Sequence, residues 1–166
     1  MEAGGVAFLL ALFVTPLWIR ILRDRSIGQK IREEGPASHQ SKAGTPTMGG
    51  VVFVGAAVAG YLMGHVGTHI AFTRSGLIVV AVTLASCLLG LLDDWIGIRR
   101  GRNLGLNKRG KLIGQLVIAG SFAWLALNWV ETSTNLSLTR FSLPGWNLTS
   151  VGWFCLATFV VVATSN

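Results

Sequence analysis

Long apolar blocks alternate with short charged stretches along this chain, and that alternation restricts what it can fold into. The blocks lie at residues 3–22, 48–64, 76–92, 112–130 and 151–166. A helix that crosses the hydrocarbon core of a bilayer needs about 20 mostly apolar residues. In lipid, such a helix satisfies its backbone hydrogen bonds internally. The sequence therefore predicts an all-α, polytopic helical bundle of about five membrane helices, forming a single membrane domain over residues 1–166.

The basic residues predict how these helices are oriented. Apolar residues make up 51% of the chain and charged residues only 13%, yet the net charge is +7. Because cytoplasmic loops of membrane proteins are enriched in Lys and Arg, we expect loops 23–47 and 93–111 to be cytoplasmic and the N-terminus to lie outside. This explains the excess charge without nucleic acid as a partner. Those two loops and the end of the first block together hold 12 of the 14 basic residues: Arg20, Arg23, Arg25, Lys30, Arg32, Lys42, Arg99, Arg100, Arg102, Lys108, Arg109 and Lys111.

The segment 131–149 is then expected to lie outside the membrane. It is rich in Ser, Thr and Asn, and its apolar residues alternate before a Pro144-Gly145 pair. Period-two alternation beside a Pro-Gly turn is typical of paired strands. A short outer β-hairpin is therefore predicted there.

Two adjacent carboxylates, Asp93 and Asp94, stand where the third block meets the expected cytoplasmic boundary. Because a helix C-terminus carries partial negative charge, acidic residues at that position need a cation. One interpretation is that Arg99 and Arg100 supply it. The other is a Mg²⁺ site, since this ion binds one or two carboxylates together with substrate phosphates. Neighbouring helical residues point about 100° apart, so only one carboxylate needs to face the metal.

The first basic loop contains a second candidate site, in the run KAGTPTMGG at residues 42–50. Thr47 is placed to cap the helix that follows. A helix N-terminus with a nearby lysine, here Lys42, can bind an anion. On composition alone, a plain turn and helix cap remains the alternative.

Four motifs, taken in order and spacing, closely resemble the phospho-N-acetylmuramoyl-pentapeptide transferase family, in its N-terminal part. They are REEGPASH at 32–39, KAGTPTMGG at 42–50, DDW at 93–95 and RNLGLNK at 102–108. The resemblance implies a ten-helix protein of the bacterial plasma (inner) membrane, with a Mg²⁺-dependent active site on the cytoplasmic face. It implies transfer of phospho-MurNAc-pentapeptide from UDP-MurNAc-pentapeptide to undecaprenyl phosphate, giving lipid I and UMP.

The resemblance also assigns roles to single residues. Asp93 and Asp94 match the paired catalytic aspartates, which we also expect to contact Mg²⁺. Lys42, Thr47, Asn103 and Lys111 are assigned to substrate binding.

Two departures from the family pattern are expected to matter. Gly97 stands where relatives commonly carry a basic residue, and the chain lacks the later motifs that supply another metal ligand. We therefore expect residues 1–166 alone to be inactive.

Two other functions remain open at this stage. One is a sister enzyme that transfers GlcNAc-1-phosphate from UDP-GlcNAc to a polyprenyl phosphate. The other is a non-catalytic membrane scaffold, which would not require the carboxylate pair. The sequence does not give the oligomeric state, and a homodimer is one of the alternatives.

Overall fold

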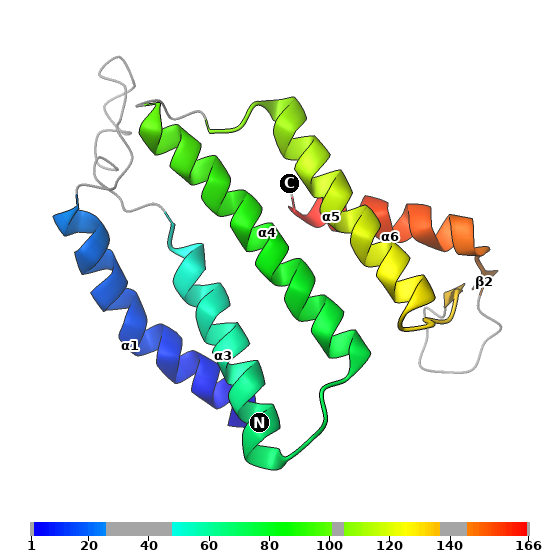
Figure 1. The fold of residues 1–166 in the computed structure, drawn as a ribbon, viewed down its shortest axis with the longest axis horizontal. Helices are drawn as coiled ribbons and strands as arrows, with labels where there is room; N and C mark the ends of the chain where they lie inside the picture. Colours follow the sequence, from blue (N-terminus) through cyan, green and yellow to red (C-terminus); the bar gives the residue numbers. More distant parts are fainter. Residues whose placement is uncertain (1, 26–47, 101–104, 137–145, 166) are drawn as a thin grey trace. The chain divides into compact units, whose positions relative to one another are not determined.

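The computed structural model describes residues 2–25, 48–100, 105–136 and 146–165, and its regular elements are almost all helical (Figure 1). The two short strands, β1 and β2, pair antiparallel, with Asn135 opposite Asn147, as expected of the predicted hairpin. The helices are α1 (Glu2–Asp24), α3 (Gly50–Thr68), α4 (Arg74–Arg99), α5 (Lys108–Asn128) and α6 (Ser150–Ser165).

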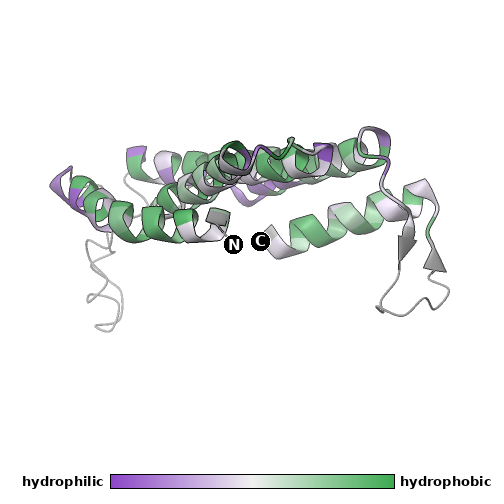
Figure 2. Cartoon of the chain, turned by 90° about the horizontal axis from the view of Figure 1, so that it is seen from below, coloured by the Kyte–Doolittle hydropathy of each residue, from purple (hydrophilic) through white to green (hydrophobic). Residues whose placement is uncertain are grey.

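The helices carry the surface expected of elements in lipid. Within the described residues, α1, α3, α4 and α5 are long and apolar enough to cross a membrane, and α6 is apolar but shorter. Large apolar side chains are exposed along them, including Phe13 at 73% and Phe53 at 71%. Figure 2 shows hydrophobic colouring along most of the helical surface and hydrophilic colouring mainly near helix ends. This distribution confirms the prediction of a polytopic helical fold.

Helix α4 extends further than the apolar block that predicts it. The expected end was Leu92, but the helix continues to Arg99. About 20 residues suffice to cross the hydrocarbon core, so the last turns of this 26-residue helix lie beyond that length. The aspartates are therefore not at a helix terminus. Because the helix-dipole effect fades within the last turn, it does not impose the need for a cation that we expected there.

Side-chain caps explain where two other helices begin. Helix α5 starts at Lys108, not at residue 112, because Asn107 Oδ1 accepts a hydrogen bond from Gly110 N at 2.7 Å. Helix α6 is capped by Thr149 Oγ1, which accepts from Gly152 N at 3.3 Å. Helix α3 differs from both, because its N-cap residue is Gly49, which has no side chain to form such a hydrogen bond. Thr47, which the sequence predicts as the cap, lies outside the described residues.

The chain forms two compact units, and the first holds residues 1–72 and 87–111. In this unit α1 and α3 pack side by side along their lengths (Figure 1). Their closest approach uses small residues. A methyl group on Gly60 would lie 2.5 Å from the Ala3 carbonyl oxygen and 2.8 Å from Ala7 Cβ, and one on Gly64 would lie 2.7 Å from Ala3 Cβ. The absence of side chains at these positions lets the helices touch.

The second unit holds residues 73–86 and 112–166. Its buried positions are Ile78 on α4 and, on one side of α5, Gln115, Ala119, Ala123 and Ala126. The ring of Phe154 on α6 lies 3.7 Å from the position that a methyl group on Gly120 would take. The unit contains the β-hairpin as well, and none of the aspartates.

The α1–α3 contact can be tested with one methyl group. Gly60→Ala should lower the free energy of unfolding by about 1–3 kcal/mol, because the added carbon is forced against α1. Gly55→Ala is the matched control, since a methyl group there meets nothing within 4 Å. Both would be measured by thermal or denaturant unfolding in the same detergent. Equal stability of the two variants would contradict the packing described.

Candidate functional site

The carboxylate of Asp93 holds the segment that leads into α5. Its Oδ1 accepts a hydrogen bond from Leu106 N at 2.7 Å, and its Oδ2 lies 3.6 Å from Lys111 Nζ. The segment approaches so closely that a methyl group on Gly105 would collide with the carbonyl and Oδ1 of Asp93. Glycine is therefore required at 105 for this loop to reach the end of α4.

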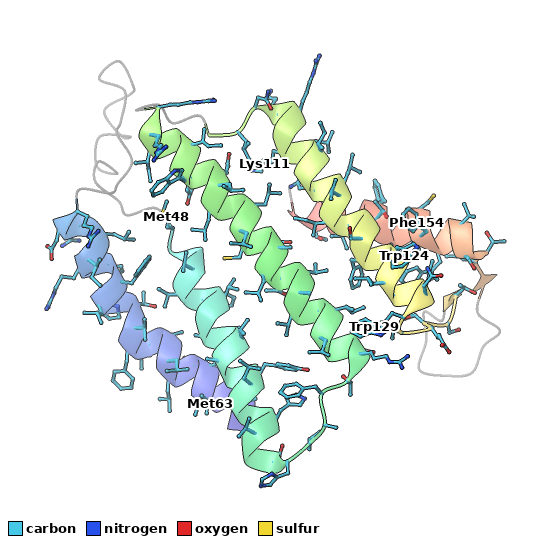
Figure 3. All side chains as sticks on the ribbon, in the orientation of Figure 1. Met48, Met63, Lys111, Trp124, Trp129 and Phe154 are labelled. Atoms are coloured by element: carbon cyan, nitrogen blue, oxygen red, sulfur yellow. The ribbon has the colours of Figure 1, made fainter. Side chains whose placement is uncertain are left out.

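The neighbouring carboxylate holds a different part of the chain. Asp94 Oδ2 accepts a hydrogen bond from Met48 N at 3.1 Å. Met48 immediately precedes the first turn of α3 and has a φ of 70°, in the left-handed region. A non-glycine residue rarely adopts this conformation unless its surroundings hold it there. The two aspartates thus fasten two segments that are distant in sequence to one end of α4, where Figure 3 labels Met48 and Lys111.

The cation that pairs with Asp93 is not one of the two arginines, Arg99 and Arg100, that the first interpretation proposed. Lys111, rather than Arg99 or Arg100, forms the ion pair with Asp93 that is seen within the described residues. The guanidinium of Arg99 instead lies over the ring of Trp95, 5.1 Å from its centroid. Lys111 is in the first turn of α5, so the early start of that helix is what brings its ammonium group to Asp93.

The other substrate-binding residues predicted from the sequence cannot be placed. Lys42, Thr47 and Asn103 all lie outside the described residues. The structure therefore brings together three of the predicted site residues, Asp93, Asp94 and Lys111.

The residues present can be tested for their fit to a divalent metal. Within the described part of the chain, no group of three or more His, Cys, Asp and Glu side chains gathers in one place. The aspartate pair alone supplies hard oxygen ligands, and Mg²⁺ commonly uses one or two carboxylates plus phosphate and water. Asp93 engages both oxygens, whereas no described residue contacts Oδ1 of Asp94. The pair therefore offers one or two of the oxygen ligands that such an ion uses, and further ligands would have to come from elsewhere.

Comparison with known proteins identifies the segment that Asp94 holds. Residues 42–54 match the family model described as phospho-N-acetylmuramoyl-pentapeptide-transferase signature 1. A phospho-N-acetylmuramoyl-pentapeptide-transferase of Salinispora arenicola is 39% identical over 188 residues, covering 99% of this chain and 50% of the relative. The transferase of the same name from Corynebacterium aurimucosum is 47% identical over 168 residues, covering 95% of this chain and 45% of the relative. The one from Corynebacterium kroppenstedtii is 45% identical over 148 residues, with 82% and 40% covered.

The chain belongs to the phospho-N-acetylmuramoyl-pentapeptide-transferase family. It spans about half the length of the curated relatives it matches. Met48 lies inside the transferase signature, so the hydrogen bond from Met48 to Asp94 joins that signature to the aspartate pair.

The sequence reasoning missed the residues that act through their backbone. Met48 and Leu106 contribute amide N–H groups to the aspartates, and neither side chain suggested a role. The glycine at 105 was the one available signal, since a glycine next to a loop motif often marks a close approach of two backbones.

Lys111 can be tested for a structural role. Its side chain is 44% exposed and that of Asp93 is 28% exposed, and ion pairs at such exposed positions contribute about 0–1 kcal/mol. Lys111→Met should therefore change the free energy of unfolding by less than about 1 kcal/mol. Lys108→Met, on the same helix turn, is the control. A much larger loss in Lys111→Met alone would show that the ion pair holds the fold together.

Proposed function

We propose that this chain forms part of the active site of an enzyme that transfers phospho-MurNAc-pentapeptide from UDP-MurNAc-pentapeptide to undecaprenyl phosphate. The observation that carries the proposal is the aspartate pair in the last turns of α4. Asp94 is bonded to the signature segment, and Asp93 is bonded to the loop before α5 and paired with Lys111 in the first turn of that helix. This gathers acidic and basic groups from three parts of the chain at one place. Such a site suits the transfer of a charged phospho-sugar.

The proposed location is a bacterial plasma membrane, with the N-terminus outside and the aspartates at the cytoplasmic face. The four candidate spans support the membrane location. The concentration of 12 of the 14 basic residues in two inter-helix segments and the helix ends that flank them supports the orientation. A nucleotide-sugar donor is soluble in the cytoplasm, while the acceptor phosphate is anchored by its hydrocarbon chain. The two can meet only at the membrane surface, which the length of α4 allows the aspartates to reach.

The proposed reaction exchanges one phosphoanhydride bond for another. An oxygen of the lipid phosphate attacks the phosphorus that bears the sugar, and the bond from that phosphorus to the bridging oxygen of UMP breaks. The sugar phosphate is then part of a lipid diphosphate, and UMP leaves. Such transfers depend mainly on positioning and on neutralising negative charge. We assign the neutralisation of that charge to Lys111 and Lys42.

The aspartates have separate parts in this proposal. Asp93 orients the loop before α5 and Lys111 in the first turn of that helix, because both of its oxygens already have partners. Asp94, with Oδ1 uncontacted by any described residue, is the better candidate to hold Mg²⁺. When bound, Mg²⁺ would neutralise charge on the diphosphate of the donor. Lys42, Thr47 and Asn103 are proposed to hold the donor.

The relatives' names do not favour the sister reaction, the transfer of GlcNAc-1-phosphate, since the relatives compared here are named for the muramoyl-pentapeptide transfer. A non-catalytic scaffold is not favoured either, because a scaffold has no need for two carboxylates that bind two separate segments. Whether the protein works as a homodimer stays open in this proposal.

The central test replaces each carboxylate by its amide in the protein at the length its gene encodes. Asp93→Asn and Asp94→Asn should each lower the rate of UMP release by at least about 10²-fold, the scale seen when one group that stabilises a transition state is removed. The amide keeps the size of the side chain and removes its charge. The measurement is UMP and lipid product formed by purified protein with undecaprenyl phosphate and Mg²⁺.

Two further samples make the test decisive. Glu131→Gln removes a carboxylate that lies in the second unit and should leave the rate unchanged. Supplying UDP-GlcNAc in place of UDP-MurNAc-pentapeptide should give no product. Normal turnover in both aspartate variants would reject the proposed roles, and product from UDP-GlcNAc would assign the sister reaction.

A further inference from the structure

A tryptophan on α1 contacts the backbone of the residue that Asp94 holds. Trp18 Nε1 donates a hydrogen bond to the Met48 carbonyl oxygen at 3.2 Å, and this carbonyl also accepts from Val51 N at 3.3 Å in the first turn of α3. The N–H of Met48 donates to Asp94 Oδ2 at 3.1 Å. Met48 is therefore held at both of its backbone polar groups, and α1 and α4 are linked through it.

The conformation of Met48 shows why two anchors are needed. Its φ of 70° is unfavourable for a residue with a side chain. The N-cap residue of α3 is Gly49, which has no side chain with which to form a capping hydrogen bond. The indole of Trp18, which is half-buried, and the carboxylate of Asp94 are the groups seen to hold the residue from outside its own helix. Without the indole hydrogen bond, Met48 is free to return to a negative φ, and its N–H would turn away from Asp94.

We propose that Trp18 is a positioning residue for the active site: by holding the Met48 carbonyl, it keeps the Met48 N–H on Asp94 and the signature segment in register with the aspartate pair. It acts through Met48 and contacts no substrate. This inference rests on the proposed function for its effect on the rate, but the contact itself exists independently of the reaction. It gives α1, which carries none of the residues assigned to catalysis, a role in the site.

The test compares Trp18→Phe with a matched control in the protein at its natural length. Phenylalanine keeps an aromatic ring and removes the indole N–H. We expect kcat to fall roughly tenfold, since a misplacement of about 1 Å can cost up to 10²-fold. The KM for UDP-MurNAc-pentapeptide should rise as well, because the signature segment that Met48 belongs to also carries Lys42 and Thr47, which are proposed to hold the donor. Trp124→Phe, at a tryptophan that is 59% exposed on α5, should leave both values unchanged.

A second substitution separates positioning from general packing. Met48→Gly keeps both backbone groups and adopts a positive φ without penalty. Combined with Trp18→Phe, it should restore part of the lost kcat, whereas it could not repair a packing defect around the indole. A kcat within twofold of wild type in Trp18→Phe, or no recovery in the double variant, would overturn the proposal.

A measurement that does not depend on enzyme activity distinguishes a failure of the proposed function from a failure of the Trp18–Met48 contact. Hydrogen exchange at the Met48 amide should become faster in Trp18→Phe and slow again in the double variant. If the wild-type protein forms no lipid product but this exchange pattern is found, the proposed function fails and the positioning contact stands. If product forms and the exchange at Met48 does not respond to Trp18→Phe, the function stands and the contact is refuted.

Discussion

Two hydrogen bonds from backbone amides to adjacent carboxylates organise the candidate site, and the proposed function depends on them. Asp93 accepts from Leu106 and Asp94 accepts from Met48. A hydrogen bond to a charged group contributes about 1.5–3 kcal/mol, roughly twice a neutral one. Because neighbouring residues on a helix point in different directions, the pair can hold two segments at once. One end of a single helix thus joins two inter-helix segments of the chain.

The membrane sets the position of this junction. A helix of the minimum spanning length would end near the lipid boundary and leave the aspartates in a loop of undefined geometry. Helix α4 instead carries them within its last turns, where the backbone is regular and each carboxylate direction is fixed. Close contact between α1 and α3 at Gly60 and Gly64 then fixes the unit that contains Met48. The packing of α1 against α3 and the polar contacts of the aspartates therefore act within the same unit.

The helices, the hairpin and the family could be predicted from the sequence. The lengths of apolar blocks and the order of motifs can be read without knowing which residues are in contact. The sequence was not sufficient for the ends of helices. Asn107 lies five residues before the apolar block begins and caps α5 there, and that cap is what places Lys111 on a helix facing Asp93. Arg99 was a reasonable ionic partner by proximity in sequence, yet its guanidinium lies over Trp95. Backbone donors such as Met48 and Leu106 leave no mark on side-chain chemistry, so motif reasoning passes over them.

The central claim is that this junction faces the cytoplasm, where a nucleotide donor can reach it, and membrane-sided labelling tests it most directly. Arg100→Cys lies next to the end of α4, and Thr132→Cys lies in the segment expected outside; both residues are exposed. With Cys87 and Cys155 replaced by Ala, a membrane-impermeant maleimide should label Arg100→Cys only in inside-out vesicles and Thr132→Cys only in intact cells. Labelling of Arg100→Cys from outside intact cells would contradict the account.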